Sequence, residues 1–191
     1  YALLFLDARC HGQSDDDSFA SLPRFAEDIE HGIAWLSGQA ETQGVPVGLI
    51  GHSVGAGAAL LAAARNPSVA LVVSLAAFAH PAAMMRRWLR FKRIPYWPFG
   101  AYILAYVQRV IGFRFDDIAP LNTISRVLCP VLLVHGLADE TVPASEAEAI
   151  YARRSHEHVE LLLIPGSHDE YADMDRHLLA LCSFLAKAHP V

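Results

Sequence analysis

Short apolar runs recur along the chain, and longer segments with a helical spacing of apolar residues lie between them. The runs span residues 1–6, 45–50, 69–76, 130–135 and 159–164, and they consist mostly of Val, Leu, Ile and Ala. A continuous apolar run of this length is typical of a strand that is covered on both faces. The pattern therefore predicts a buried parallel sheet, with residues 1–6 as one of its central strands.

Helical patterns fill the intervals between these runs. One apolar stripe with spacings of four, four and three predicts a helix from Ser21–Leu22–Pro23 to about Ala40, and it consists of Phe25, Ile29, Ile33 and Leu36. Further helices are expected at 58–64, 145–154 and 171–188. Strands that alternate with helices indicate βαβ units, so we expect the α/β class with a doubly wound, mostly parallel sheet. The length of 191 residues predicts a single domain over 1–191.

Residues 78–126 fit neither a strand nor a simple crossover helix, and they predict an insertion that forms a lid over the sheet edge. The segment is rich in aromatic residues, of which Trp88, Trp97 and Tyr102 are candidates for contact with substrate. The alternative is that such aromatics only attach the insertion to the domain. Arginines are also frequent here, and no Asp or Glu occurs from Thr42 to Arg114. This basic cluster is either a solvated helix face or attracts an acidic substrate, an anionic membrane or an acidic partner.

Composition narrows the functional classes. A net charge of −5 and a pI of about 6.0 argue against a general nucleic-acid binder. The three cysteines form no C-x-x-C pair, which fits a cytoplasmic protein with structural thiols. The longest apolar stretch without charge, residues 94–107, contains proline and is too short to span a bilayer, so no transmembrane segment is expected.

The segment Gly51-His52-Ser53-Val54-Gly55 carries the clearest chemical signal. A serine between two glycines, after a strand and before a helix, matches the G-x-S-x-G turn that exposes a nucleophilic hydroxyl. Side chains at Gly51 and Gly55 are expected to collide with the neighbouring strand and helix. The N–H of Val54 opens the helix and points toward the serine, so it is a candidate oxyanion donor. The pentapeptide alone occurs often enough by chance to need supporting residues.

A serine hydroxyl needs a base and a group that orients the base, and the chain supplies both after later strands. Asp139 follows the run 130–135, and His168 follows the run 159–164. This is the order Ser, Asp, His that a strand–turn–helix nucleophile requires. Glu140 is an alternative acid, but one residue further along the turn it should point elsewhere. His168 is the histidine in the loop after the last strand, and His52, beside the nucleophile, is a further candidate for substrate contact.

No metal or organic cofactor is expected. The remaining histidines, including His156 and His158, lack a supporting Cys or carboxylate cluster with ligand spacing. They are interpreted as surface or core residues.

With these motifs the chain resembles the α/β-hydrolase superfamily over nearly its whole length. Residues 7–14, Asp-Ala-Arg-Cys-His-Gly-Gln-Ser, are similar to the D-x-R-G-x-G-x-S loop of that family, although Cys10 stands where glycine is usual. The resemblance implies that the first strands and a His-Gly oxyanion loop precede Tyr1. Since losing one oxyanion donor costs a hundred- to a thousandfold in rate by order of magnitude, we expect a longer form to hydrolyse esters faster than these 191 residues.

The resemblance implies a serine hydrolase that cleaves a carboxylic ester with an apolar part, without cofactor, acting on a small molecule rather than nucleic acid. A peptidase, a thioesterase or an acyltransferase could use the same residues, and so could a non-catalytic binding protein of the same fold. A lipase recruited to a membrane surface by the arginine-rich lid is a further alternative. The sequence does not indicate an oligomeric state.

Overall fold

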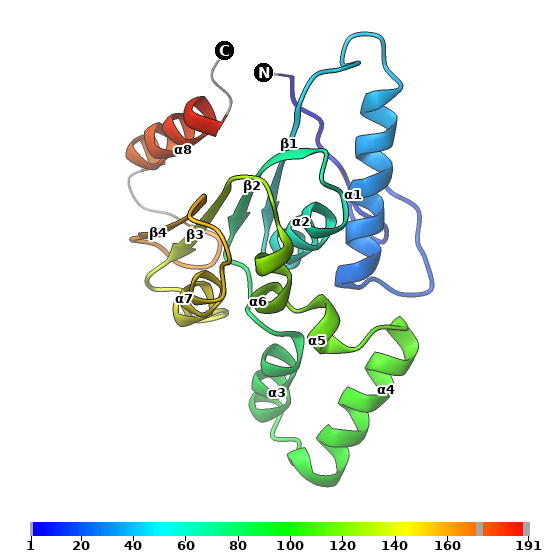
Figure 1. Ribbon diagram of the computed structural model, residues 1–191. Coiled ribbons are helices and arrows are strands. Elements are labelled where there is room, and N and C mark those ends of the chain that lie inside the picture. The colour runs from blue at the N-terminus through cyan, green and yellow to red at the C-terminus, as the bar shows by residue number, and fades with distance from the viewer. Residues whose placement is uncertain (1, 171–173, 189–191) are drawn as a thin grey trace.

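Four parallel strands form one sheet in the order β1-β2-β3-β4 (Figure 1). The computed structural model describes residues 2–170 and 174–188. The strands are β1 (Val47–His52), β2 (Val69–Leu75), β3 (Val131–Gly136) and β4 (Val159–Ile164). The main helices are α1 (Leu22–Ser37), α2 (Val54–Arg65), α3 (Pro81–Phe91), α4 (Ala101–Ile111), α7 (Ser145–Ala152) and α8 (Met174–Ala188). The predicted α/β class with a parallel sheet is confirmed.

Alternating strand residues build two cores, one on each face of the sheet. Val72 of β2 and Leu133 of β3 pack with Leu60 of α2 and Ile150 of α7 on one face. Neighbouring positions in the same strands face the other way and pack against Phe184 of α8, and these are Leu71, Val73, Leu132 and Val134. Because both faces are covered, β3 is buried at every position, which explains its uninterrupted apolar sequence.

Helix α1 begins where its sequence signals predict. The side chain of Ser21 accepts a hydrogen bond from the N–H of Arg24 at 3.4 Å, and Pro23 occupies the first turn, where its missing N–H costs nothing. The helix ends at Ser37 rather than near Ala40. A Cβ at Gly57 of α2 would lie 2.9 Å from the Leu22 side chain, so the glycine lets α1 pack closely on α2.

Residues 2–6 do not form the central strand that their apolar run predicts. They run extended beside α1, and Leu3 and Phe5 are 74% and 88% exposed. Leu4 and Leu6 point toward Gly32 of α1, their methyl groups 3.8 Å from where its Cβ would be. A strand exists only when a neighbour accepts its backbone hydrogen bonds. Within the described residues β1 pairs with β2 alone, so residues 2–6 have no ladder partner and the prediction is wrong.

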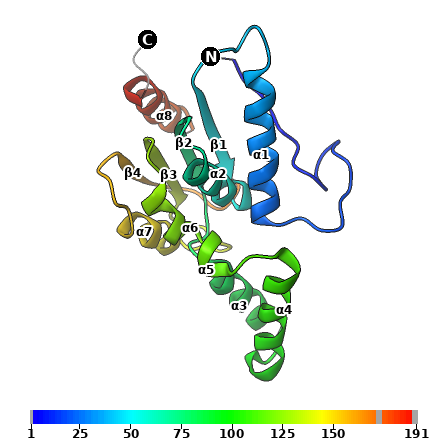
Figure 2. The same ribbon diagram turned by 45° about the vertical axis from the view of Figure 1, so that its right-hand side comes forward.

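All regular secondary structure between β2 and β3 is helical. Besides α3 and α4 it contains η1 (Tyr96–Gly100), α5 (Phe115–Ile118), α6 (Pro120–Thr123) and η2 (Ile124–Arg126). Figures 1 and 2 show α3 and α4 projecting from the body as a helical hairpin. The later part returns to the core, where Phe115, Ile118 and Ile124 are buried. The expected insertion is therefore a projecting hairpin with a packed return segment, and its role as a lid stays a prediction.

Candidate active site

Ser53 lies at the sharp turn between β1 and α2 with a φ of 54° and a ψ of −117°. Its N–H donates a hydrogen bond to the carbonyl oxygen of Leu75 in β2 at 2.8 Å, which ties this turn to the sheet. A positive φ is unfavourable for any residue with a Cβ, and such strain typically marks a functional turn. The local sequence makes the turn possible, because a Cβ at Gly51 would lie 2.3 Å from the carbonyl oxygen of Gly55.

Gly55 does not have the role expected for it. A Cβ at this position would meet no heavy atom within 4 Å in the described part of the chain, apart from the backbone of its own helix. The two glycines that bracket Ser53 therefore differ: Gly51 is required by close backbone approach, and Gly55 lies at the open start of α2. The expectation of a collision at Gly55 is wrong.

Ser53, His168 and Asp139 form a continuous hydrogen-bonded chain. His168 Nε2 lies 3.1 Å from Ser53 Oγ, and His168 Nδ1 lies 2.7 Å from Asp139 Oδ2. The three residues follow β1, β4 and β3 in turn, so the carboxyl ends of three parallel strands bring them to one edge of the sheet. The Asp139 side chain is fully buried and that of His168 is 14% exposed, which leaves Ser53 at the outer end of the chain.

The carboxylate of Asp139 is fixed by backbone donors. Its Oδ1 accepts hydrogen bonds from the N–H groups of Thr141 and Val142 at 2.9 and 2.7 Å. Burial acts to raise the pKa of Asp139, but the Val142 N–H and the hydrogen bond from His168 outweigh it and hold the pKa below its ordinary value. The group is therefore an anion at neutral pH, directed at the imidazole of His168.

Beneath Asp139 lies His135, which the sequence analysis assigned no function. Its side chain is fully buried, and its Nε2 lies 2.7 Å from the carbonyl oxygen of Val142 and 3.3 Å from Asp139 Oδ2. Since both partners only accept, Nε2 carries the proton. The detectable signal is a histidine at the end of an otherwise apolar buried strand, a position where a polar side chain needs partners.

The loops that carry Asp139 and His168 pack directly on one another. The N–H of Ala138 donates to the carbonyl oxygen of Gly166 at 2.9 Å. A Cβ at Gly136 would lie 2.5 Å from the carbonyl oxygen of Ser167, next to His168. Glycine at the end of β3 is therefore what allows the two loops to approach to hydrogen-bonding distance.

His52 lies beside His168 and contacts it in two ways. Its Nε2 is 2.8 Å from the carbonyl oxygen of His168, and the two rings are 4.9 Å apart. Because a carbonyl only accepts, the His52 ring donates this bond and so supports the backbone of His168. The His52 side chain is 41% exposed. Its contact with a substrate stays a prediction.

The other candidates for substrate contact lie on the hairpin. Trp88, Trp97 and Tyr102 are 53%, 79% and 71% exposed. These side chains are largely exposed to solvent, and their contact with substrate stays a prediction.

The N–H of Val54 is directed by the start of α2. Ala56 and Gly57 donate their N–H groups to the carbonyl oxygen of Ser53 at 3.1 and 3.3 Å. Across residues 2–170 and 174–188, no acceptor pairs with the N–H of Val54. The positive end of the helix therefore offers one backbone donor next to the serine hydroxyl.

One group of potential metal ligands coincides with this site. His52, His168 and Asp169 each place a ligand atom within 4.8 Å of the others. The ring nitrogens of His168 already contact Ser53 and Asp139, so a metal bound there would compete with that chain of hydrogen bonds.

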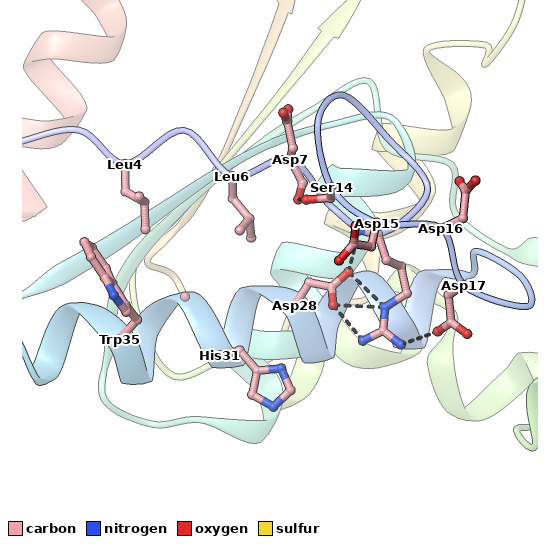
Figure 3. A pocket seen from close by; sticks show the side chains of 12 residues that line it. Leu4, Leu6, Asp7, Ser14, Asp15, Asp16, Asp17, Asp28, His31 and Trp35 are labelled. Atoms are coloured by element: carbon pink, nitrogen blue, oxygen red, sulfur yellow. Dashed lines mark hydrogen bonds and ion pairs between the residues drawn. The ribbon is translucent and has the colours of Figure 1, made fainter.

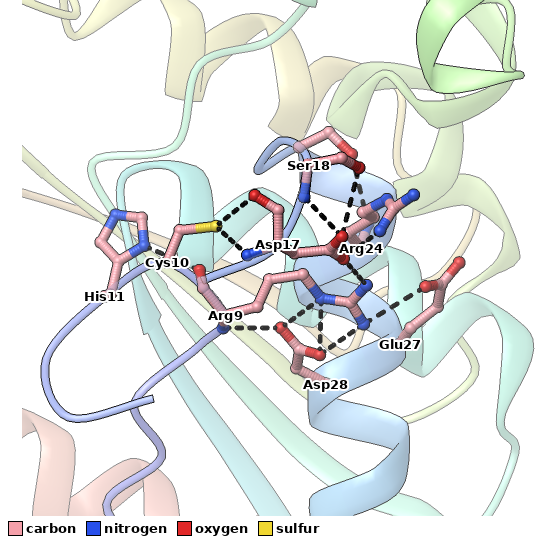
Figure 4. A network of polar contacts seen from close by, with 9 residues as sticks. Arg9, Cys10, His11, Asp17, Ser18, Arg24, Glu27 and Asp28 are labelled. Atoms are coloured by element: carbon pink, nitrogen blue, oxygen red, sulfur yellow. Dashed lines mark hydrogen bonds and ion pairs between the residues drawn. The ribbon is translucent and has the colours of Figure 1, made fainter. Parts of the chain in front are cut away.

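The loop after residues 2–6 is held on α1 by Arg9 (Figure 4). The guanidinium contacts the carboxylate of Asp28 at 2.6 Å and that of Asp17 at 3.0 Å, and Arg24 also pairs with Asp17. Cys10, which replaces the usual glycine, adopts a φ of 63°, so the left-handed turn that favours glycine is kept. Its Sγ accepts a hydrogen bond from the N–H of Asp17 at 3.2 Å.

A hollow of about 580 Å³ lies between this loop and α1 (Figure 3). Leu4, Leu6 and Trp35 line its apolar half, and acidic residues of the loop line the other half. Neither Ser53 nor its partners His168 and Asp139 line this hollow, so it is separate from the candidate active site.

A parallel sheet with a strained serine turn, and with Asp and His loops after later strands, defines the α/β-hydrolase fold. The sequence profile of the family described as serine aminopeptidase, S33 (Hydrolase_4) matches residues 1–109. This match covers more than half of the chain, which therefore belongs to that family within the α/β-hydrolase superfamily.

The chain is also similar to individual proteins. YqkD of Bacillus subtilis is 26% identical over 180 residues, which cover 92% of this chain and 58% of YqkD. The chain thus spans little more than half the length of this relative. The esterase Pf2001 of Pyrococcus furiosus shares the fold with a TM-score of 0.71 at 20% identity, covering 94% of this chain and 68% of the esterase. Est1E of Butyrivibrio proteoclasticus, whose structure contains ferulic acid, has a TM-score of 0.69 at 22% identity, covering 95% of this chain and 75% of Est1E.

Proposed function

We propose that this hydrolase cleaves a carboxylic ester through an acyl-enzyme intermediate on Ser53. The proposal rests on two hydrogen-bond contacts. His168 Nε2 lies 3.1 Å from Ser53 Oγ, and His168 Nδ1 lies 2.7 Å from Asp139 Oδ2. A hydroxyl becomes a nucleophile when a base takes its proton and a third group holds the base in one tautomer. The buried anion of Asp139 supports that third role.

In the first half-reaction Ser53 Oγ attacks the ester carbonyl carbon, and its proton passes to His168 Nε2. The carbonyl oxygen becomes an oxyanion, for which the N–H of Val54 is a donor at the start of α2. Collapse of this intermediate breaks the bond to the alcohol, which leaves with the proton from His168. Asp139 stays ionised and stabilises the imidazolium that forms between the two proton transfers.

In the second half-reaction a water molecule gives its proton to His168 Nε2 and attacks the acyl carbon of the Ser53 ester. The second oxyanion collapses, the bond to Ser53 Oγ breaks, and the proton returns from His168 to the serine. The carboxylic acid is released and the enzyme is regenerated. Each proton and electron pair is accounted for by the three side chains and water.

The proposed substrate is an ester of small to medium size with an apolar acyl or alcohol part. The esterase Pf2001, which shares the fold, supports an ester over other acyl bonds. The family description names an aminopeptidase, which favours a second candidate, cleavage of an aminoacyl amide by the same three residues. Both reactions proceed through an acyl-enzyme intermediate, and they differ in the acyl group and in whether an alcohol or an amine leaves.

A panel of chromogenic substrates tests the proposal. The protein at its natural length is assayed with nitrophenyl esters of short acyl chains, a thioester and an aminoacyl nitroanilide, with Ser53→Ala as the blank. We expect the esters to be hydrolysed fastest and the blank to be inactive. The matched control is Ser183→Ala, which removes an exposed hydroxyl from α8.

Labelling with a fluorophosphonate separates the enzyme from a binding protein of the same fold. A covalent adduct on Ser53, found by peptide mass spectrometry, is expected. In the substrate panel, faster turnover of the nitroanilide than of the esters would favour peptidase activity over esterase activity. Unlabelled Ser53 in a folded protein would favour the non-catalytic alternative.

A further inference from the structure

The projecting hairpin of α3, η1 and α4 gathers most of the exposed aromatic surface of the described chain. Nine aromatic side chains of the described residues are exposed, and seven of them lie on this hairpin. They are Trp88, Phe91, Tyr96, Trp97, Phe99, Tyr102 and Tyr106, with exposed fractions between 46% and 80%. Large apolar patches of this kind on a folded protein mark interaction sites.

The exposed rings do not take part in packing the hairpin onto the body. Leu89 of α3 and Leu104 of α4 are buried in the core that also contains Phe115. On α4 the opposite face shows Tyr102 and Tyr106, whose rings stack with their centroids 6.3 Å apart. Each helix therefore uses one face for the core and presents a second apolar face to solvent.

Cations are interleaved with these aromatic rings. Lys92 Nζ lies 5.9 Å from the ring of Trp88, and the guanidinium of Arg86 lies 5.0 Å from the ring of Tyr96. Arg90 and Arg93 are also exposed at this end of the hairpin, whereas Arg87 pairs with Glu146 of α7. Since no acidic residue occurs from Thr42 to Arg114, the hairpin is positive in a protein whose net charge is −5.

We propose that the end of this hairpin, residues 86–99, docks on an anionic lipid surface. The aromatic rings of Trp97 and Phe99 enter the boundary between headgroups and acyl chains, and Lys92 and Arg93 contact lipid phosphates. Aromatic residues with a polar edge favour this boundary, and each nearby cation adds attraction to anionic lipid. The inference concerns the exposed end of the hairpin and does not depend on the proposed function.

The shape and charge of the surface favour lipid over the other occupants. A second copy would bring the same positive charges against this hairpin, which opposes self-association. The end of the hairpin projects outward in both views, which suits docking on an extended lipid surface (Figures 1 and 2). The two helices have 11 residues each, and no described helix is long and apolar enough to cross a bilayer. Docking is therefore expected at the surface of the lipid, without a spanning segment.

Co-sedimentation with vesicles tests the proposal. The protein is mixed with vesicles that contain phosphatidylglycerol or with vesicles of phosphatidylcholine alone, at about 0.05 and about 0.5 M salt. We expect binding to the anionic vesicles at low salt, and binding at least about tenfold weaker to phosphatidylcholine or at high salt. Equal binding to both vesicle types, or no binding to either, would overturn the proposal.

Variants assign the binding to the hairpin. Lys92→Gln with Arg93→Gln is expected to weaken binding to anionic vesicles about 25-fold, because each cation contributes about fivefold. Trp97→Ala with Phe99→Ala is expected to weaken it by more than about tenfold. The matched controls are Arg153→Gln with Arg154→Gln at the end of α7, and Trp35→Ala on α1, all exposed positions. Controls that weaken binding as much as the hairpin variants would contradict the assignment.

Fluorescence reports whether Trp97 reaches the lipid. In a variant with Trp35→Phe and Trp88→Phe, Trp97 is the remaining tryptophan among these 191 residues, and we expect a blue shift and quenching by brominated acyl chains. Circular dichroism checks that each variant is folded. Sedimentation without lipid tests whether a second copy binds this surface instead. If the protein is a dimer, and Trp97→Ala with Phe99→Ala makes it a monomer, the hairpin binds a second copy and the lipid proposal is wrong.

Discussion

His135 donates its Nε2–H to the carbonyl oxygen of Val142 at 2.7 Å, inside the turn that presents Asp139. The N–H of Val142 in turn donates to Asp139 Oδ1 at 2.7 Å. One buried imidazole therefore holds the backbone of Val142, the residue whose N–H supports the carboxylate. Because Val142 is also fully buried, water cannot replace the bond from His135.

Replacing His135 is expected to impair both the fold and the proposed reaction. His135→Leu leaves a buried carbonyl without a donor, which should lower the free energy of unfolding by about 2 kcal/mol. A shift of Asp139 should lower kcat about tenfold or more with little change in KM. His135→Gln keeps an N–H donor and should recover most of the loss. Urea unfolding and steady-state ester hydrolysis measure the two effects, and equal damage by Gln and Leu would contradict this role of His135.

Asp139→Asn is expected to keep the fold while it lowers activity. The amide oxygen can still accept from Thr141 and Val142, but the loss of an anion whose pKa the fold holds low should lower the free energy of unfolding by about 2 kcal/mol. The neutral side chain no longer stabilises the imidazolium of His168, which should lower kcat by about 10⁴-fold. Glu140→Gln, at the exposed neighbouring position, is the matched control and should keep full activity. A comparable loss in Glu140→Gln would move the acid to that residue.

The two glycines around Ser53 are expected to respond oppositely to alanine. Gly51→Ala forces a Cβ to within 2.3 Å of the carbonyl oxygen of Gly55, which should destabilise the protein by about 3 kcal/mol. Gly55→Ala meets no such contact and should be neutral or stabilising by up to about 1 kcal/mol, because alanine favours a helix. Thermal unfolding of the two variants measures the difference. Similar losses in both would mean that Gly55 is as crowded as Gly51.

Acid should weaken the fold partly through Asp28. Partial burial acts to raise the pKa of this carboxyl, but hydrogen bonds from the side chain and N–H of Arg9 hold it below the ordinary value of 3.8. The folded state therefore binds fewer protons than the unfolded state in this range. The stabilisation is complete above about pH 5 and is lost as the pH falls through 3.8 toward the folded pKa.

The variant Asp28→Asn tests this linkage. It should lower the free energy of unfolding by about 2 kcal/mol at pH 7 and flatten its fall in acid. Some acid sensitivity should remain, because the pKa of Asp139 is depressed in the same direction. Asp16→Asn is the control, since Asp16 makes no ion pair with Arg9 among the described residues. An unchanged slope in Asp28→Asn would place the acid sensitivity elsewhere.

Much of the sheet and of the candidate site was predictable because both depend on patterns along the chain. The strands at 69–75, 131–136 and 159–164 agree with their apolar runs to within a residue or two. The order Ser53, Asp139 and His168, each after a strand, predicted their proximity because parallel strands end at one edge. Helix α2 starts at Val54 instead of Ala58, since burial of Ala56 and Gly57 outweighs the low helix propensity of its glycines.

What the sequence could not predict depends on neighbours in space. Residues 2–6 have the composition of a strand, but composition does not reveal whether a partner edge is present. His135 carried no motif, and its role follows from two distances that only the folded chain provides. The aromatic residues of the hairpin were expected either to contact substrate or to attach the insertion to the domain. Their spacing does not reveal that Trp88, Trp97 and Tyr102 are exposed in the described structure, and their contact with substrate stays a prediction.

The uncovered side of β1 has a consequence for how these 191 residues behave in solution. Ile50 is 57% exposed on the face that α8 covers elsewhere, and the outer edge of β1 pairs with no other described strand. Leu3 and Phe5 add further exposed apolar surface along the extended segment. An unprotected strand edge beside apolar side chains templates pairing between molecules and slow aggregation. Concentration and storage time therefore become variables in any measurement on these 191 residues, and dilute, fresh samples are the appropriate starting point.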